Sequence, residues 1–287
     1  MTRHLAADET LPPPRWPDSG RNRGGFQPPE VLFDDNFDQG FCGWRDHQGA
    51  AFAYAPLSRT ALRTLDGSSH SLVLSTGARP NSSANIPHAE VSAYKNLSRW
   101  VDSGLVKFET WIAQGGADLD NSPNSWFIGI DTQRWDNSSR GFFKLRFRKF
   151  TGSGEAPVRS DQWALTNDVG SFVNLSPNPP NAGDNENKMN FNYIALTVDL
   201  DTVVSSDGAP GSYHEAQVGA DVYDLTGLGA GRGKQNPQIG SSVGAGSFAG
   251  GLNFGIGMTN NTVHTAAGPS WLLVGRVRGT WYPRSGA

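Results

Sequence analysis

The stretch from Gly104 to Ala113 constrains the fold most strongly, because its apolar and polar side chains alternate. Successive side chains point to opposite faces of a β-strand, so this pattern predicts a strand with one face in the core. The inward set is Val106, Phe108, Thr110 and Ile112, and the outward set is Lys107, Glu109 and Trp111. We expect a binding function on the outward face, which carries a charge pair and a large ring.

Short apolar runs separated by Gly, Asn, Asp and Ser continue to the C-terminus, and no segment has a helical period. This texture predicts an all-β fold, either an antiparallel sandwich or a barrel. The predicted strands are Val31–Phe37, Ala51–Tyr54, Ser71–Ser75, Glu90–Tyr94, Gly104–Ala113, Trp126–Asp131, Gly141–Lys149, Asp161–Leu165, Asn190–Leu200, His214–Leu225, Leu252–Gly257 and Trp271–Tyr282.

Three further strands repeat the alternation of the first. The predicted inward residues are Phe143, Leu145 and Phe147, then Ile194, Leu196, Val198 and Leu200, then Leu273, Val277 and Trp281. A solvated charged face is the ordinary explanation for the polar residues between them. If the sheet brings them together, the outward cations could instead form a patch for an anionic partner; they are Lys107, Lys144, Arg146, Arg148, Arg276 and Arg278.

The chain of 287 residues is expected to form one main domain with an appendage. Residues 1–29 are rich in proline and read as an extended arm, and residues 30–287 form the sandwich. Trp16 and Phe26 are the candidate apolar anchors of the arm if it docks on a neighbouring subunit; disorder is the other interpretation. Four stretches are predicted to be long loops: Gly115–Ser125, Thr151–Ser160, Asn174–Asn190 and Gly227–Gly251.

Charge and cysteine content exclude several classes of protein. A net charge of -3 and a pI near 6.1 argue against sequence-independent nucleic-acid binding. Cys42 is the single cysteine, which excludes an internal disulfide and a multi-cysteine zinc site. No apolar stretch has the length of a signal peptide or a membrane span, so we expect a product made in the cytoplasm without membrane insertion.

The sequence contains no recognisable catalytic motif. A glycosidase needs two carboxylates about 5 Å or more apart, and Asp199 with Asp201 has a suitable spacing but stands at a predicted strand end. A lyase-type pair could be drawn from Tyr193, Tyr213 and His214, but no spacing singles one out. We therefore predict no catalytic residue and a protein that is not an enzyme.

Aromatic side chains amid Asn-rich loops are suited to glycan recognition, because sugar C–H faces stack on flat rings. The candidate glycan-binding residues are Trp111, Glu109, Lys107, Arg146 and Trp135. For a metal, Asp34, Asp35 and Asp38 supply the hard oxygen ligands that calcium prefers, although Asp is also an ordinary turn residue. No other cofactor is expected.

Four segments carry a resemblance to a known family: Leu32–Trp44, Ser71–Gly77, Gly104–Ala113 and Trp271–Tyr282. With them the chain resembles concanavalin A-like lectin and glucanase jelly rolls and the related carbohydrate-binding modules, over about residues 31–283. The resemblance implies a jelly-roll β-sandwich that binds carbohydrate. The Glu-x-Asp-x-x-Glu pattern of the laminarinase-like branch is absent, so the resemblance does not imply hydrolysis.

The layout of the chain, a start without a leader followed by a proline-rich arm, is similar to that of minor tail and other virion proteins of tailed bacteriophages. The expected function is therefore a non-enzymatic virion subunit whose lectin-like domain binds a glycan of the host cell envelope. The arm would join it to other virion subunits or to copies of itself. Two alternatives stay open: a polysaccharide lyase or glycoside hydrolase on the same fold, and a purely architectural virion subunit.

Overall fold

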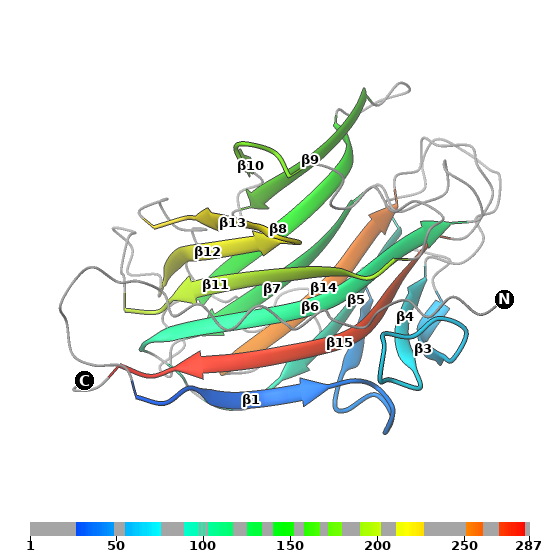
Figure 1. The fold of residues 1–287 in the computed structure, drawn as a ribbon, viewed down its shortest axis with the longest axis horizontal. Helices are drawn as coiled ribbons and strands as arrows, with labels where there is room; N and C mark the ends of the chain where they lie inside the picture. Colours follow the sequence, from blue (N-terminus) through cyan, green and yellow to red (C-terminus); the bar gives the residue numbers. More distant parts are fainter. Residues whose placement is uncertain are drawn as a thin grey trace, which may run out of the picture.

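A computed structural model describes residues 27–48, 55–75, 89–97, 99, 101, 103–116, 125–133, 140–151, 158–166, 172–179, 190–201, 211–226, 251–260 and 270–284. Every regular element in these ranges is a β-strand, and strands are paired antiparallel throughout (Figure 1). The same ranges contain no helix with the length and apolar character needed to cross a membrane.

Two sheets contain all the strands. The eight-stranded sheet has the order β13 (Asp221–Asp224), β12 (Ser212–Val218), β11 (Asn192–Asp199), β6 (Leu105–Gly116), β15 (Ser270–Tyr282), β4 (Ser71–Ser75) and β3 (Ala55–Thr60), with β1 (Glu30–Asp35) also paired to β15. The seven-stranded sheet has the order β10 (Phe172–Asn174), β9 (Val158–Thr166), β8 (Arg140–Thr151), β7 (Ser125–Gln133), β14 (Leu252–Asn260), β5 (Ala89–Asn96) and β2 (Arg45–Gln48).

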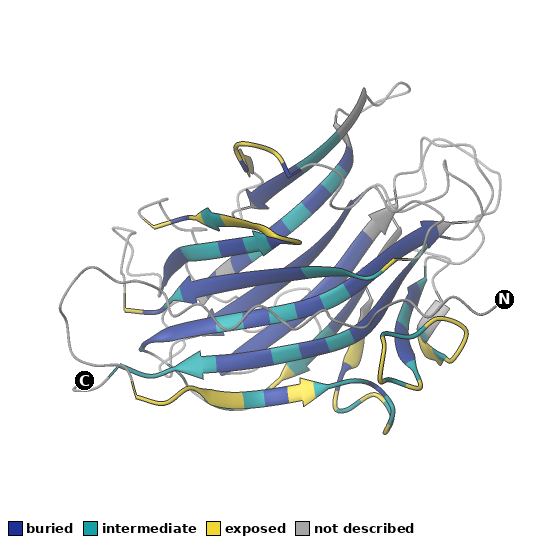
Figure 2. Cartoon of the chain, viewed as in Figure 1, coloured by how far each residue is buried: buried dark blue, intermediate teal, exposed yellow. Residues whose placement is uncertain are grey.

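The predicted antiparallel β-sandwich is confirmed. The chain passes from one sheet to the other at each step from β4 to β7, which is the kind of crossing that characterises double-sheet jelly rolls. The core lies between the sheets, where apolar side chains of both inner faces are almost completely buried (Figure 2). The jelly-roll form expected from the sequence therefore agrees with the strand order.

The alternation predicted for the first strand is also confirmed. Val106, Phe108 and Ile112 are at most 1% exposed and belong to the core, while Lys107 and Glu109 point outward and are only partly buried. Thr110 lies on the inner face and its hydroxyl donates to the backbone oxygen of Ile194 at 3.1 Å, so a polar atom in the core is satisfied. The predicted inward residues of β8 and β11 are buried as expected.

The prediction for β15 is wrong at one residue. Leu273 was expected on the inner face with Val277, but it pairs with Ala113 and so shares the outer face with Trp111. The pairing between β15 and β6 shifts between Val274 and Arg276, and this bulge changes which side chains point inward. Leu272 and Val274 therefore join Val277 in the core.

Several elements escaped prediction because they are short or interrupted. The segment His214–Leu225 was predicted as one strand, but it forms β12 and β13, joined by a tight turn in which Gly219 has a φ of 60°. Strands β2, β3 and β10 were not predicted, and the predicted strand Ala51–Tyr54 lies outside the described residues. Most of each predicted long loop lies outside them as well.

The first strand of the sandwich, β1, begins at Glu30. Just before it, the backbone N–H of Gln27 donates to the oxygen of Pro283 at 3.1 Å, so the two ends of the domain lie together. Residues 1–26, with Trp16 and Phe26, lie outside the described part of the chain.

Candidate functional site

Outward residues of β6, β11 and β15 in the eight-stranded sheet form one candidate surface, which we call the Lys107 face: Lys107, Glu109, Trp111, Tyr193, Arg276 and Arg278. Antiparallel register places Tyr193 beside Trp111, and Arg278 beside Glu109. The Tyr193 hydroxyl donates to Oε1 of Glu109 at 2.7 Å, and Nζ of Lys107 lies 3.8 Å from the same oxygen. Glu109 therefore has a hydrogen-bond partner across the sheet and a cation on its own strand.

Trp111 is held by two neighbours on this face. The ring of Tyr193 meets it edge-on with centroids 5.1 Å apart, and the guanidinium of Arg276 lies 5.7 Å from its centroid. Arg276 in turn makes a bidentate ion pair with Asp34, at 2.7 and 2.6 Å. Trp111, the predicted binding platform, is thus part of a network of side chains that contact one another. Such cross-strand pairs stabilise a β-sheet.

The environment of Tyr193 leads to a prediction about pH. Burial first, and then the charge of Glu109 and the hydrogen bond to it, raise the pKa of Tyr193. A pKa that is higher in the folded than in the unfolded state gives stability that is complete below about pH 10 and is lost as the pH rises further. We expect Tyr193→Phe to lower the free energy of unfolding by about 1–3 kcal/mol at pH 8, where it removes a hydrogen bond to a carboxylate.

The loss caused by Tyr193→Phe should shrink between pH 8 and pH 11, because only the wild type has this hydroxyl to ionise on unfolding. Urea unfolding of both proteins at the two pH values measures the difference. An equal difference at pH 8 and pH 11 would contradict the assignment.

The three carboxylates predicted as calcium ligands have separate protein partners. Asp34 pairs with Arg276; Asp35 accepts bonds from Nε1 of Trp44 at 3.0 Å and Nζ of Lys95 at 2.8 Å. Asp38 accepts the backbone N–H groups of Ser69 and His70 at 2.7 and 3.0 Å, so it anchors the turn before β4. Among the described residues no three His, Cys, Asp or Glu side chains gather as a metal site would require.

The predicted glycan-binding residues do not lie together. Arg146 points outward from β8 in the seven-stranded sheet, while Lys107, Glu109 and Trp111 point outward from the other sheet, so the core separates them. Trp135 lies outside the described residues. The condition for a common patch, that the sheet brings the cations together, is not met for Lys107 and Arg146, because their strands belong to different sheets.

The outer face of the seven-stranded sheet has an unusual floor. Three glycines, Gly129 of β7 with Gly255 and Gly257 of β14, occupy neighbouring outward positions. A Cβ atom on Gly255 would lie 2.5 Å from the ring of Tyr94, and one on Gly257 would lie 2.4 Å from the ring of Phe127. The glycines are therefore required for the two rings to lie flat across the strands.

We call this surface the glycine-floored face and define it by Gly129, Gly255 and Gly257 together with Tyr94, Phe127, Lys144, Arg146 and Arg148. The three cations occupy alternate positions of β8, so they point the same way at intervals of about 7 Å. Nζ of Lys144 lies 4.7 Å from the centroid of Phe127, and Nη2 of Arg146 donates to the Ser125 hydroxyl at 2.6 Å. Burial lowers the pKa of Arg148, while all three side chains keep part of their surface exposed.

Buried polar side chains complete the glycine-floored face. Asn253 of β14 donates to Oδ2 of Asp131 at 3.3 Å and accepts a bond from Asn96. Ser92 of β5 is fully buried beside Gly257, and its hydroxyl oxygen has no hydrogen-bond partner. Buried hydroxyls are nearly always hydrogen-bonded in folded proteins, so the unbonded hydroxyl of Ser92 is an exception to that rule.

Of this face, Arg146 alone is among the glycan-binding residues predicted from the sequence. A signal was present, because Gly255 and Gly257 alternate with apolar residues in a strand pattern, and glycine in a strand often marks the close approach of another group. The cations of β8 were among those predicted as a possible patch for an anionic partner. What the sequence does not contain is the pairing of β7 with both β8 and β14, which brings the cations and glycines together.

The acid–base candidates either share an arginine partner or lie apart in the fold. Asp199 and Asp201 both pair with Arg284, at 3.1 and 2.6 Å, and so hold the C-terminal segment. Tyr213 is buried in the core, where its hydroxyl bonds to the backbone of Lys144, whereas Tyr193 lies on the Lys107 face. Among the described side chains of the glycine-floored face, Asp131 is the one carboxylate.

Comparison with known proteins finds no matching family model and no matching curated protein. Among solved structures, an endo-1,3-beta-glucanase from Streptomyces sioyaensis is 12% identical, with a TM-score of 0.45 over 88% of this chain and 96% of the other. A cellulose-induced protein is 13% identical, with a TM-score of 0.43 over 86% and 96%, and peanut lectin is 11% identical, with 0.42 over 88% and 97%. These likenesses are too remote to say what this chain binds.

Proposed function

We propose that the protein is a non-enzymatic carbohydrate-binding protein that holds an acidic polysaccharide, such as one of a cell envelope, on its glycine-floored face. The observation that carries this proposal is the row of Lys144, Arg146 and Arg148 along one edge of the glycine floor. Guanidinium and ammonium groups at regular intervals suit the repeated carboxylates of a uronic-acid chain. The half-buried ring of Tyr94 and the amide of Asn96 add groups that sugars contact in proteins.

The Lys107 face is the weaker candidate, although sequence analysis favoured it. Its charges are engaged with one another, since Glu109 is bound by Tyr193 and Asp34 by Arg276. A glycan carboxylate would have to displace Asp34 from a bidentate pair to reach Arg276.

A binding experiment tests the proposal. The triple variant Lys144→Gln, Arg146→Gln, Arg148→Gln is expected to bind polygalacturonate or alginate at least about 100-fold more weakly than the wild type, because hydrogen bonds to charged groups contribute about 1.5–3 kcal/mol each. Isothermal titration at two salt concentrations measures the affinity and its salt dependence. Neutral dextran is expected not to bind.

The matched control is Lys107→Gln, Arg278→Gln on the opposite face, which should retain the wild-type affinity. Equal loss in both variants, or equal binding of dextran and polygalacturonate, would overturn the proposal. Release of unsaturated products or reducing ends from either acidic polymer would instead favour the lyase or hydrolase alternative. No binding at all, with a folded protein, would leave the architectural subunit as the better account.

The virion setting predicted from the layout of the chain stays a prediction. It rests on the arm of residues 1–29, most of which lies outside the described residues. The proposed attachment to other virion subunits, or to further copies of the chain, rests on the same segment through Trp16 and Phe26. Calcium binding likewise stays a prediction. The carboxylates of Asp34, Asp35 and Asp38 have separate protein partners and do not converge on one point.

A further inference from the structure

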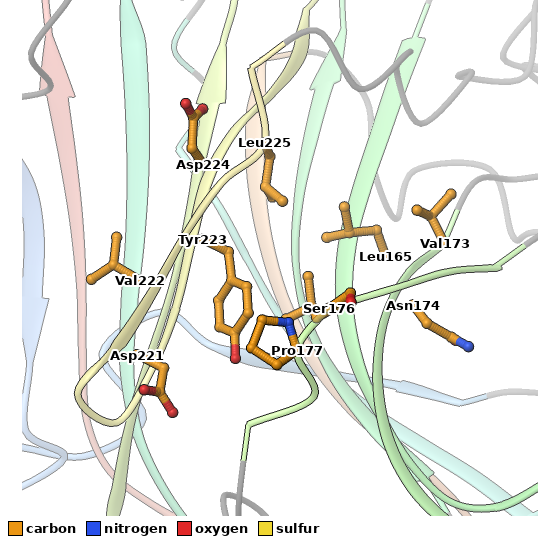
Figure 3. Close-up of a pocket in the computed structure, with 11 residues that line it drawn as sticks. Leu165, Val173, Asn174, Ser176, Pro177, Asp221, Val222, Tyr223, Asp224 and Leu225 are labelled. Atoms are coloured by element: carbon orange, nitrogen blue, oxygen red, sulfur yellow. The ribbon is translucent and has the colours of Figure 1, made fainter.

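A groove of about 460 Å³ lies between β10 and β13, where one edge of each sheet is found (Figure 3). Its apolar lining comes from Leu165, Val173, Leu175, Pro177, Val222, Tyr223 and Leu225. In Figure 3 the ring of Tyr223 stands beside Pro177, and Leu225 is directed toward Leu165. Cavities of this volume are typical of sites that accept a small molecule or a short peptide.

Both strands that border the groove have an unpaired edge. Within the described residues β13 pairs with β12 alone, and β10 pairs with β9 alone. The backbone N–H of Leu225 donates to the backbone oxygen of His214 on β12 at 2.9 Å. Because hydrogen-bonding groups alternate along an antiparallel strand, the N–H and C=O groups of Val222 and Asp224 point away from β12. The backbone N–H of Leu175 donates to the backbone oxygen of Trp163 at 2.9 Å, so by the same alternation the backbone N–H and C=O groups of Asn174 point away from β9.

One side of this groove carries inward-facing side chains that are not fully covered. Tyr223 and Asp221 lie opposite Ala216 and Val218, which are core residues, so both side chains point between the sheets. Val173 is paired with the core residue Leu165 and yet is 50% exposed. An apolar side chain that faces inward and remains exposed marks a place where a layer of the sandwich is missing.

The charge of the groove is acidic. Asp221 lies at its rim and makes no hydrogen bond or ion pair with the part of the chain that the structure describes, and it contributes after burial to the raised pKa of Tyr223. No described lysine, arginine or histidine lines the groove. A carboxylate that points inward at a sheet edge disfavours pairing with an apolar strand, but it favours a strand that brings a positive charge.

We propose that this groove binds an extended basic peptide segment, which adds to the edge of β13 as a further antiparallel or parallel strand. The segment carries an apolar side chain opposite Tyr223 and an arginine or lysine two positions away, opposite Asp221, because side chains two apart on a strand share a face. The unpaired backbone edge selects a peptide rather than a glycan, and the charge of Asp221 selects a basic one. The groove is separate from the glycine-floored face, so this inference does not depend on the proposed carbohydrate function.

Two capped probe peptides test the inference: Ser-Thr-Leu-Thr-Arg-Thr-Ser, and the same peptide with glutamate in place of arginine. Titration of the full chain, followed by calorimetry or by amide shifts of β13, is expected to show saturable binding of the arginine peptide only. Asp221→Lys should weaken the arginine peptide about 10-fold or more and should allow the glutamate peptide to bind, as expected for a close charge pair.

A second variant tests the edge pairing itself. Val222→Pro removes an N–H that points away from β12, so it keeps the ladder of the sheet while blocking an added strand. It should abolish binding of the arginine peptide, whereas Val222→Thr, which keeps the N–H, should not; cooperative thermal unfolding of each variant checks the fold. Unchanged binding by Val222→Pro, equal effects of Asp221→Lys on both peptides, or no saturation by the arginine peptide would overturn the proposal.

Discussion

Replacement of Phe108 by alanine is expected to lower the free energy of unfolding by about 3–5 kcal/mol, the usual loss for a large aromatic side chain in a packed core. Phe108 is fully buried on the inner face of β6 and contacts rings from three other segments. Its centroid lies 6.3 Å from Phe33, 6.2 Å from Trp44 in a stacked arrangement and 5.1 Å from Phe254. These contacts join β1 and β6 to β14 across the sandwich, so the cavity cannot close by movement of one strand.

Urea unfolding followed by tryptophan fluorescence measures this loss. Leu62→Ala is the matched control, because Leu62 is 95% exposed and its removal should leave the free energy of unfolding unchanged. A loss below about 1 kcal/mol for Phe108→Ala would contradict the packing of the two sheets described above.

Replacement of Lys95 by methionine is expected to cost about 3–5 kcal/mol, because it leaves a poorly hydrated carboxylate without its counter-charge. Nζ of Lys95 lies 2.8 Å from Oδ2 of Asp35, and the two side chains are only 13% and 12% exposed. The same ammonium donates to the backbone oxygen of Cys42 and lies 5.0 Å from the Phe33 ring. Lys95 thus ties β5 of one sheet to β1 of the other and to the turn before Trp44.

The comparison variant is Arg99→Met. It removes a pair with Glu30, but both partners are more than a third exposed, and exposed pairs contribute little to stability. Thermal and urea unfolding of the two variants should therefore differ clearly. If Asp35→Asn together with Lys95→Met restores most of the loss, the cost lies in the stranded charge; if the double variant is as unstable as the single one, that explanation is wrong.

The sequence predicted well the elements whose alternation is long and unbroken. Ser71–Ser75 agrees at both ends with β4, and the inward residues of β6, β8 and β11 are buried as expected. It failed where the local pattern is interrupted. A bulge moved Leu273 to the outer face, and a tight turn at Gly219 divided one predicted strand into β12 and β13.

The candidate site was only partly predictable. Alternation correctly assigned Lys107, Glu109, Lys144 and Arg146 to outward faces, since that depends on neighbours in the chain. It could not tell that the first two and the last two belong to different sheets. That choice depends on which strands pair, and the pairing of β7 with β14 joins residues more than a hundred positions apart.

The sequence by itself therefore determined the class of fold, the inward residues and the cations available on β8, because a period of two is a local property of the chain. Only the tertiary structure decided that Arg146 lies beside Phe127 and the glycine floor, and that Trp111 is held between Tyr193 and Arg276. Strand order and register are set by the packing of the whole core. Within the described residues, the same packing leaves β10 and β13 each with an unpaired edge at the groove, which no local pattern in either strand indicates.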